Sequence, residues 1–124
     1  MLRKTVKIDG IDVPFQASAA TPRYYRAKFQ RDIYKDIQKL ESSFNDRVSN
    51  ESELEIDDLE IFENVAYIMA YQANPTIPEM IEDWLDQFEM FSIYEVLPEI
   101  LELWGKNMYS ESVTKKNTAA LSAN

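Results

Sequence analysis

The chain has 124 residues, with 13 basic and 22 acidic side chains and a formal charge of −9. It contains neither cysteine nor histidine, which excludes disulfides, zinc–thiolate sites and the most common general base near neutral pH. Gly10 and Gly105 are its two glycines, too few for a glycine-rich phosphate loop. We therefore expect a small non-enzymatic domain that needs no metal or cofactor.

The charge is divided unevenly along the chain. Residues 1–48 carry a net +4, residues 49–108 a net −14 and residues 109–124 a net +1. These portions are either separate solvated faces or surfaces through which copies associate, basic front to acidic back. Arg23, Arg26 and Lys28 are the candidate residues for such self-association.

The chain shows no membrane-directed segment. Its first nine residues contain no apolar run, and no apolar stretch reaches about 18 residues. We expect a cytoplasmic protein without a membrane partner. Because nucleic-acid binding needs a positive field, the acidic balance also argues against that partner.

Residues 4–16 are predicted to form a β-hairpin. Two segments of alternating polarity flank Asp9 and Gly10, and Asp-Gly is a strong hairpin signal because glycine tolerates a positive φ. Pro14 has no N–H to donate, so the second strand either lies at an edge or ends there. An isolated hairpin is marginal in water, so this one must pack on helices or pair with another copy.

A long helix is predicted to begin at Thr21, with threonine as the N-cap and Pro22 in the first turn. Its apolar stripe recurs at spacings of three and four and comprises Tyr25, Phe29, Ile33, Ile37, Leu40 and Phe44. The pattern leaves room for a break near Gln30, after which Asp32 caps a second segment.

Residues 45–56 are polar and are predicted to link the basic and acidic portions. Asp57 or Asp58 is expected to cap a helix that runs to about residue 73, where Asn74 and Pro75 end it. A further helix is predicted to begin at Thr76.

Ser92 is predicted to cap a last helix, with Pro98 as a kink and Gly105 as its C-terminal cap. Residues 109–124 have no apolar pattern and are predicted to be a disordered, flexible tail. The expected fold is thus α+β and mostly α. It has an N-terminal hairpin and about four helices in one domain over residues 1–108.

The acidic clusters are not interpreted as sites. Residues 51–58 lack the glycine that an EF-hand loop requires, and carboxylates on an exposed helix face are usually solvated. Aromatic residues at helical spacing are core candidates, although they are numerous enough for some to line an exposed groove. They are Trp84, Phe88, Phe91, Tyr94 and Trp104.

Four segments together resemble the phage tail assembly chaperones of siphophages and prophages of Gram-positive bacteria. They are residues 6–15 (VKIDGIDVPF), 19–26 (AATPRYYR), 59–69 (LEIFENVAYIM) and 74–85 (NPTIPEMIEDWL). The resemblance covers about residues 5–105 and lies in order and spacing rather than in an invariant motif.

This resemblance implies a non-enzymatic assembly factor that binds the long helical tape measure protein, keeps it soluble and brings tail tube subunits to it. Such a protein acts in the cytoplasm of the infected or lysogenic host and is absent from the finished virion. The resemblance implies self-association through the hairpin and first helix, and client binding by the acidic helical half, where the five aromatic residues are the candidates.

The family also implies a longer, frameshifted form of the protein as a partner. Thr114, Lys115 and Lys116 can be encoded as ACA AAA AAG, on which a ribosome can slip back by one base. The alternative to a chaperone is a small acidic inhibitor of the DNA-mimic type, acting on a basic host protein. The basic front half weighs against it, because mimics usually present acidic groups on all exposed sides.

Overall fold

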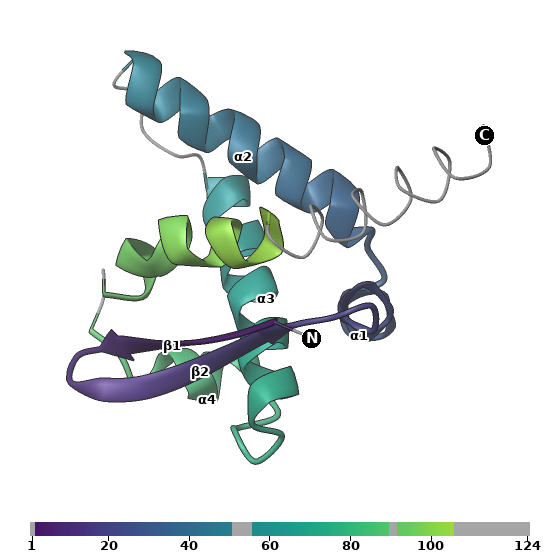
Figure 1. Cartoon of the computed structure of the whole chain (residues 1–124), viewed down its shortest axis with the longest axis vertical. Helices are drawn as coiled ribbons and strands as arrows, with labels where there is room; N and C mark the ends of the chain where they lie inside the picture. Colours follow the sequence, from purple (N-terminus) through teal and green to yellow (C-terminus); the bar gives the residue numbers. More distant parts are fainter. Residues whose placement is uncertain (1, 51–55, 90–91, 106–124) are drawn as a thin grey trace, which may run out of the picture.

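The computed structural model describes residues 2–50, 56–89 and 92–105. Its elements are β1 (Leu2–Ile8), β2 (Ile11–Ala17), α1 (Thr21–Phe29), α2 (Ile33–Asn50), α3 (Ile56–Ala73), α4 (Ile81–Leu85) and the 3₁₀ turn η1 (Ser92–Val96), which continues as an α-helix over residues 97–105. The predicted class, an N-terminal hairpin followed mainly by helices, is confirmed (Figure 1). The predicted flexible tail, with the codons proposed for frameshifting, lies outside the described residues.

The hairpin closes through a two-residue turn with a positive φ at both positions, 53° at Asp9 and 79° at Gly10. This is the type I′ geometry that matches the twist of the strands. Ile8 pairs with Ile11 across the turn, and Thr5 pairs with Pro14. Since hydrogen-bonded and non-hydrogen-bonded pairs alternate from the turn, Pro14 falls at a non-hydrogen-bonded pair. The strand therefore continues past Pro14 as an edge strand.

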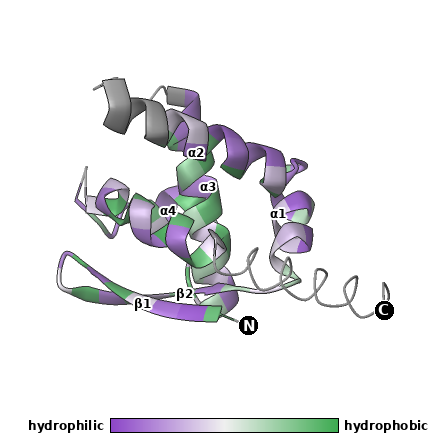
Figure 2. Cartoon of the chain, turned by 45° about the horizontal axis from the view of Figure 1, so that its top comes forward, coloured by the Kyte–Doolittle hydropathy of each residue, from purple (hydrophilic) through white to green (hydrophobic). Residues whose placement is uncertain are grey.

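Helix α3 is the centre of the fold. Residues 65–70 are all buried, which means that neighbours cover the helix on every side. It packs against β2, α1, α2, α4 and η1. Figure 2 shows it as an apolar column within more polar elements. The core draws on both the basic and the acidic portions of the sequence, from Ile8 to Trp104.

The predicted break in the first helix is confirmed. Gln30 adopts a left-handed φ of 54° and its N–H donates to the carbonyl of Arg26, which ends α1. Asp32 then caps α2, because its Oδ1 accepts the N–H of Tyr34 at 2.8 Å. The whole predicted stripe is buried or half-buried.

The prediction that Thr21 caps α1 is wrong. Ala20 precedes the helix, and Thr21 is its first residue and fully buried. The Thr21 hydroxyl accepts the N–H of Ser18 at 2.9 Å and donates to Gln72 Oε1 at 2.5 Å. The hydroxyl therefore connects α1 to α3.

Two predicted boundaries around the acidic portion also need correction. Helix α2 continues to Asn50, so the first half of the predicted linker is helical, while residues 51–55 lie outside the described residues. Helix α3 begins at Ile56, which places Asp57 and Asp58 inside its first turn rather than at its cap. The positive end of the helix dipole still favours carboxylates at these positions.

The helix predicted from Thr76 begins later, at Ile81, and is short. The Thr76 hydroxyl and N–H both donate to Asn74 Oδ1, at 2.5 and 3.1 Å, in a local turn. The Tyr67 hydroxyl donates to the carbonyls of Pro78 and Glu79, at 2.6 and 2.9 Å. These carbonyls therefore pair with a side chain of α3 instead of starting a helix.

The last helix is confirmed with changes at both ends. It starts as a 3₁₀ turn at Ser92 and becomes α-helical at Leu97, immediately before Pro98. The Ser92 hydroxyl donates to Asp9 of the hairpin turn at 2.5 Å. Gly105 is still helical and has no positive φ, so it is not a left-handed cap.

Candidate functional site

An extended hollow lies between α2 and the helix of residues 97–105. One part, of about 470 Å³, is lined by Tyr34, Ile37, Gln38, Glu41, Trp104 and Gly105. The next part, of about 360 Å³, is lined by Glu41, Phe44, Pro98, Leu101 and Glu102. Because Glu41 lines both parts, we treat them as one surface and call it the α2 groove.

Helical periodicity builds this groove. Tyr34, Ile37, Glu41 and Phe44 follow one another at spacings of three and four, so they share one side of α2. The helix rises by about 15 Å, or about three turns, over the ten steps from Tyr34 to Phe44. The groove is therefore long enough for a short helix lying along it.

An aromatic contact closes one end of the α2 groove. The rings of Tyr34 and Trp104 meet edge to face, with centroids 5.5 Å apart. Trp104 is 3 % exposed and forms the floor, whereas Tyr34 is 43 % exposed and offers its ring to a ligand. Phe44 and Leu101, at the other end, are half-buried.

The rim of the α2 groove is acidic. Glu41 and Glu102 are exposed on its two sides. Glu102 and Glu99 share Lys4 of the hairpin, whose Nζ lies 3.4 Å from Glu102 Oε2 and also pairs with Glu99. An apolar floor between carboxylates suits a helix with one apolar face and basic flanks.

A second, smaller hollow of about 260 Å³ lies between α1 and α3. Tyr24, Ala27, Lys28, Tyr67, Tyr71 and Glu79 line it, and we call it the tyrosine groove. Lys28 Nζ lies 5.1 Å from the centroid of the Tyr67 ring and donates to the Glu79 carbonyl at 3.0 Å. Burial raises the pKa of Tyr67, so its hydroxyl keeps its proton and remains a donor.

The candidate self-association residues are divided by these contacts. Arg23 and Arg26 are exposed on α1, and neither forms an ion pair with any residue that the structure describes. Lys28 is also exposed, but it is held by Tyr67 and Glu79. Of these three candidates, only Arg23 and Arg26 carry a charge that no described residue engages.

The five candidate aromatic residues do not form one exposed surface. Trp84 and Trp104 are core residues, 2 % and 3 % exposed, and of the four that the structure describes only Trp104 lines the α2 groove. Phe88 and Tyr94 are half-buried, with Phe88 edge-on to Trp84 and Tyr94 beside Phe62. Phe91 lies outside the described residues. Periodicity predicts that all five face an apolar environment, but it does not show which elements each ring packs against.

Tyr34 and Tyr24 are the exposed rings of the two grooves, and neither is among the candidate site residues named from the sequence. Each lies next to a buried stripe residue, Ile33 and Tyr25 respectively. The sequence signal for both is a large aromatic residue beside, rather than within, a buried apolar stripe. In the structure these rings are 43 % and 47 % exposed, which core packing does not explain.

The described residues offer little for catalysis or metal binding. Within them, no three His, Cys, Asp or Glu side chains lie close enough to hold a metal ion. Glu63 has a raised pKa because of burial and the nearby charges of Glu60 and Glu82, but neither histidine nor cysteine exists in the chain as a partner. Across the described helices, none is both long and apolar enough to span a membrane.

Comparison with known proteins identifies no similar protein. No protein-family model, no curated protein and no solved structure matches this chain.

Proposed function

We propose that this chain is a phage tail assembly chaperone that binds a helical segment of the tape measure protein and keeps that protein soluble. The α2 groove is the observation that carries the proposal, because its apolar floor and acidic rim fit one face of an amphipathic helix. A tape measure protein is long and helical, and its apolar faces would aggregate before the tail tube encloses them. Covering those faces requires binding and no bond chemistry.

The proposal includes the remaining features that the family resemblance implies. The complex recruits tail tube subunits in the cytoplasm of the infected or lysogenic host, and the chaperone does not enter the virion. The net charge of −9 helps to keep the loaded complex soluble. A longer, frameshifted form of the protein is a further partner.

The alternative, an acidic mimic of DNA, has weaker support. Arg3, Lys7, Arg23 and Arg26 are all exposed on the hairpin and α1. A phosphate mimic presents acidic groups on the surface that its target contacts, and these cations would repel a basic target.

Co-expression tests the proposal directly. The partner is the longest coiled-coil-rich protein encoded beside this gene, and the readout is its soluble fraction with and without the chaperone. We expect the wild-type chain to keep the partner soluble and to co-purify with it. A partner that stays insoluble, or a neighbourhood without virion genes, would overturn the proposal.

A matched pair of variants locates the client. Tyr34 and Tyr24 are similarly exposed, at 43 % and 47 %, and each contacts one aromatic ring edge-on. Tyr34→Glu places a charge in the α2 groove and is expected to abolish solubilisation, whereas Tyr24→Glu in the tyrosine groove should preserve it. Equal effects of the two variants would exclude the α2 groove as the client site.

A further inference from the structure

The two outer edges of the hairpin are chemically different. The non-hydrogen-bonded pairs are Arg3 with Gln16, Thr5 with Pro14 and Lys7 with Asp12, and the backbone N–H and C=O groups of these residues point away from the partner strand. On β2 the central position is Pro14, which has no N–H. On β1 the central position is Thr5, so the outer edge of β1 keeps every donor and acceptor.

The outer edge of β1 is unpaired. Within residues 2–50, 56–89 and 92–105, no backbone hydrogen bond is made by the N–H or C=O of Arg3, Thr5 or Lys7. The side chains of all three are exposed. A row of unpaired strand groups is a template for another strand.

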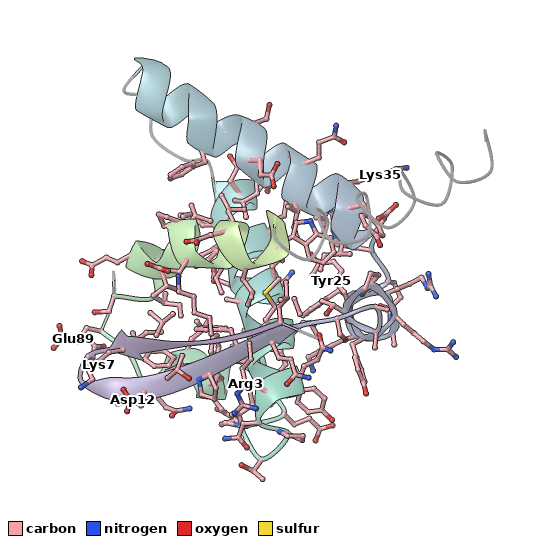
Figure 3. All side chains as sticks on the ribbon, viewed as in Figure 1. Arg3, Lys7, Asp12, Tyr25, Lys35 and Glu89 are labelled. Carbon is pink, nitrogen blue, oxygen red and sulfur yellow. The ribbon has the colours of Figure 1, made fainter. Side chains whose placement is uncertain are left out.

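The charge along this edge is positive. Arg3 and Lys7 flank Thr5 on the face opposite the one that packs on the helices, and neither forms an ion pair within the described part of the chain. Figure 3 shows both side chains along the hairpin, far from α2. Lys4, on the inner face, differs because it pairs with Glu99 and Glu102.

This charge disfavours a second copy as the added strand. Antiparallel pairing of two β1 strands about Thr5 would place Arg3 of each copy opposite Lys7 of the other. Like charges directly opposite each other across strands are destabilising. A strand with carboxylates at alternate positions would instead place an anion opposite each cation.

We propose that the outer edge of β1 accepts an extended, acidic segment of another protein as a third strand. The three outward-facing residues of β1 exchange backbone hydrogen bonds with that segment, and Arg3 and Lys7 select its acidic side chains. A third strand also strengthens a two-stranded sheet, which is marginal alone. The net negative charge of the chain repels an acidic segment only weakly, because charges beyond about 8 Å are screened at physiological salt. Strand β1 itself carries three cations and no anion.

The probe for this proposal is a fluorescein-labelled seven-residue peptide of alternating glutamate and valine, followed by fluorescence anisotropy. The same peptide with lysine in place of glutamate is the charge control. We expect saturable binding of the glutamate peptide, protection of the Thr5 amide from hydrogen exchange, and no binding of the lysine peptide. Equal binding of both peptides, or none of the glutamate peptide, overturns the proposal.

Proline variants test the edge itself. Thr5→Pro removes the central outward donor at a pair where Pro14 already shows that proline leaves the hairpin ladder intact. Gln16→Pro makes the matched change on the outer edge of β2. Thr5→Pro should weaken glutamate-peptide binding by about tenfold or more, and Gln16→Pro should not. An unchanged affinity in Thr5→Pro overturns the proposal.

A second variant covers the case in which Thr5→Pro does not fold. The double variant Arg3→Glu with Lys7→Glu alters only exposed side chains. It should bind the lysine peptide in preference to the glutamate peptide. A wild-type dimer that these changes strengthen or abolish would instead identify a second copy as the occupant and overturn the proposal. Tyr34→Glu should leave peptide binding intact, so failure here is distinguishable from failure of the chaperone function.

Discussion

The Tyr25 hydroxyl donates a 2.7 Å hydrogen bond to Asp36 Oδ2, where the last turns of α1 meet the start of α2. Tyr25 is fully buried and Asp36 is 5 % exposed. Arg31, in the break between the two helices, completes the cluster with hydrogen bonds of 2.7 and 2.8 Å to the two carboxylate oxygens. The cluster connects α1 to the first turn of α2, the turn that carries Tyr34.

Removing the Tyr25 hydroxyl should therefore destabilise the fold. Tyr25→Phe keeps the ring and its contact with Phe29 but removes a bond to a charged group, at a cost of about 1–2 kcal/mol in the free energy of unfolding. Urea denaturation measures the change. Tyr24→Phe is the control, because its exposed hydroxyl should change the value by less than about 0.5 kcal/mol.

The same cluster should make stability depend on acid pH. Burial pushes the pKa of Asp36 upward, but the bonds from Arg31 and Tyr25 outweigh it and hold this pKa below its usual 3.8. The stabilisation is complete above that usual value and is lost as the pH falls through the lower, folded-state pKa. The difference in unfolding free energy between wild type and Asp36→Asn should be constant near neutral pH and shrink below about pH 4. A difference that grows in acid would show that Asp36 is not stabilised as its carboxylate.

The two glycines should respond oppositely to alanine. A Cβ at either position meets no atom within 4 Å, but Gly10 has a φ of 79° and Gly105 is helical. Gly10→Ala should cost about 1 kcal/mol through backbone strain alone. Gly105→Ala should gain about 0.5 kcal/mol from helix propensity. Loss of stability in both variants would contradict the turn geometry as the cause.

Local signals predict most of this fold because they depend on neighbours in sequence. Asp9 and Gly10 specify their turn without help from elsewhere, and the spacing of Ile33, Ile37 and Leu40 specifies a helix face. The errors arise where a distant residue competes for a local group. The Thr21 hydroxyl bonds to Gln72, 51 positions away, instead of capping its own helix.

The α2 groove could not be predicted from the sequence for a similar reason. Periodicity identifies Trp104 as an inward position but does not show that Tyr34 is the ring that meets it. The outer edge of β1 is different, since the turn and the position of Pro14 already fix which backbone groups point outward. The structure adds that no described residue forms a backbone hydrogen bond with Arg3, Thr5 or Lys7 along that edge.

Self-association gives the last prediction. Arg23 and Arg26 lie exposed on α1, while Glu79, Glu82 and Asp83 lie exposed at and before α4. If copies associate basic front to acidic back, the contact joins different surfaces and can propagate into a ring or a spiral. Lys28 is left out of the test because it holds the tyrosine groove through Tyr67 and Glu79.

Arg23→Glu with Arg26→Glu should therefore lower the oligomer mass measured by light scattering. The wild-type oligomer should also dissociate between about 0.1 M and about 1 M salt, because the Debye length falls from about 10 Å to about 3 Å. Lys35→Glu, which reverses an exposed cation on α2 rather than α1, is the control and should leave the mass unchanged. An oligomer that resists salt, or that survives reversal of both arginines, would show that apolar contacts hold the copies together, and Tyr24 in the tyrosine groove would then be the residue to test.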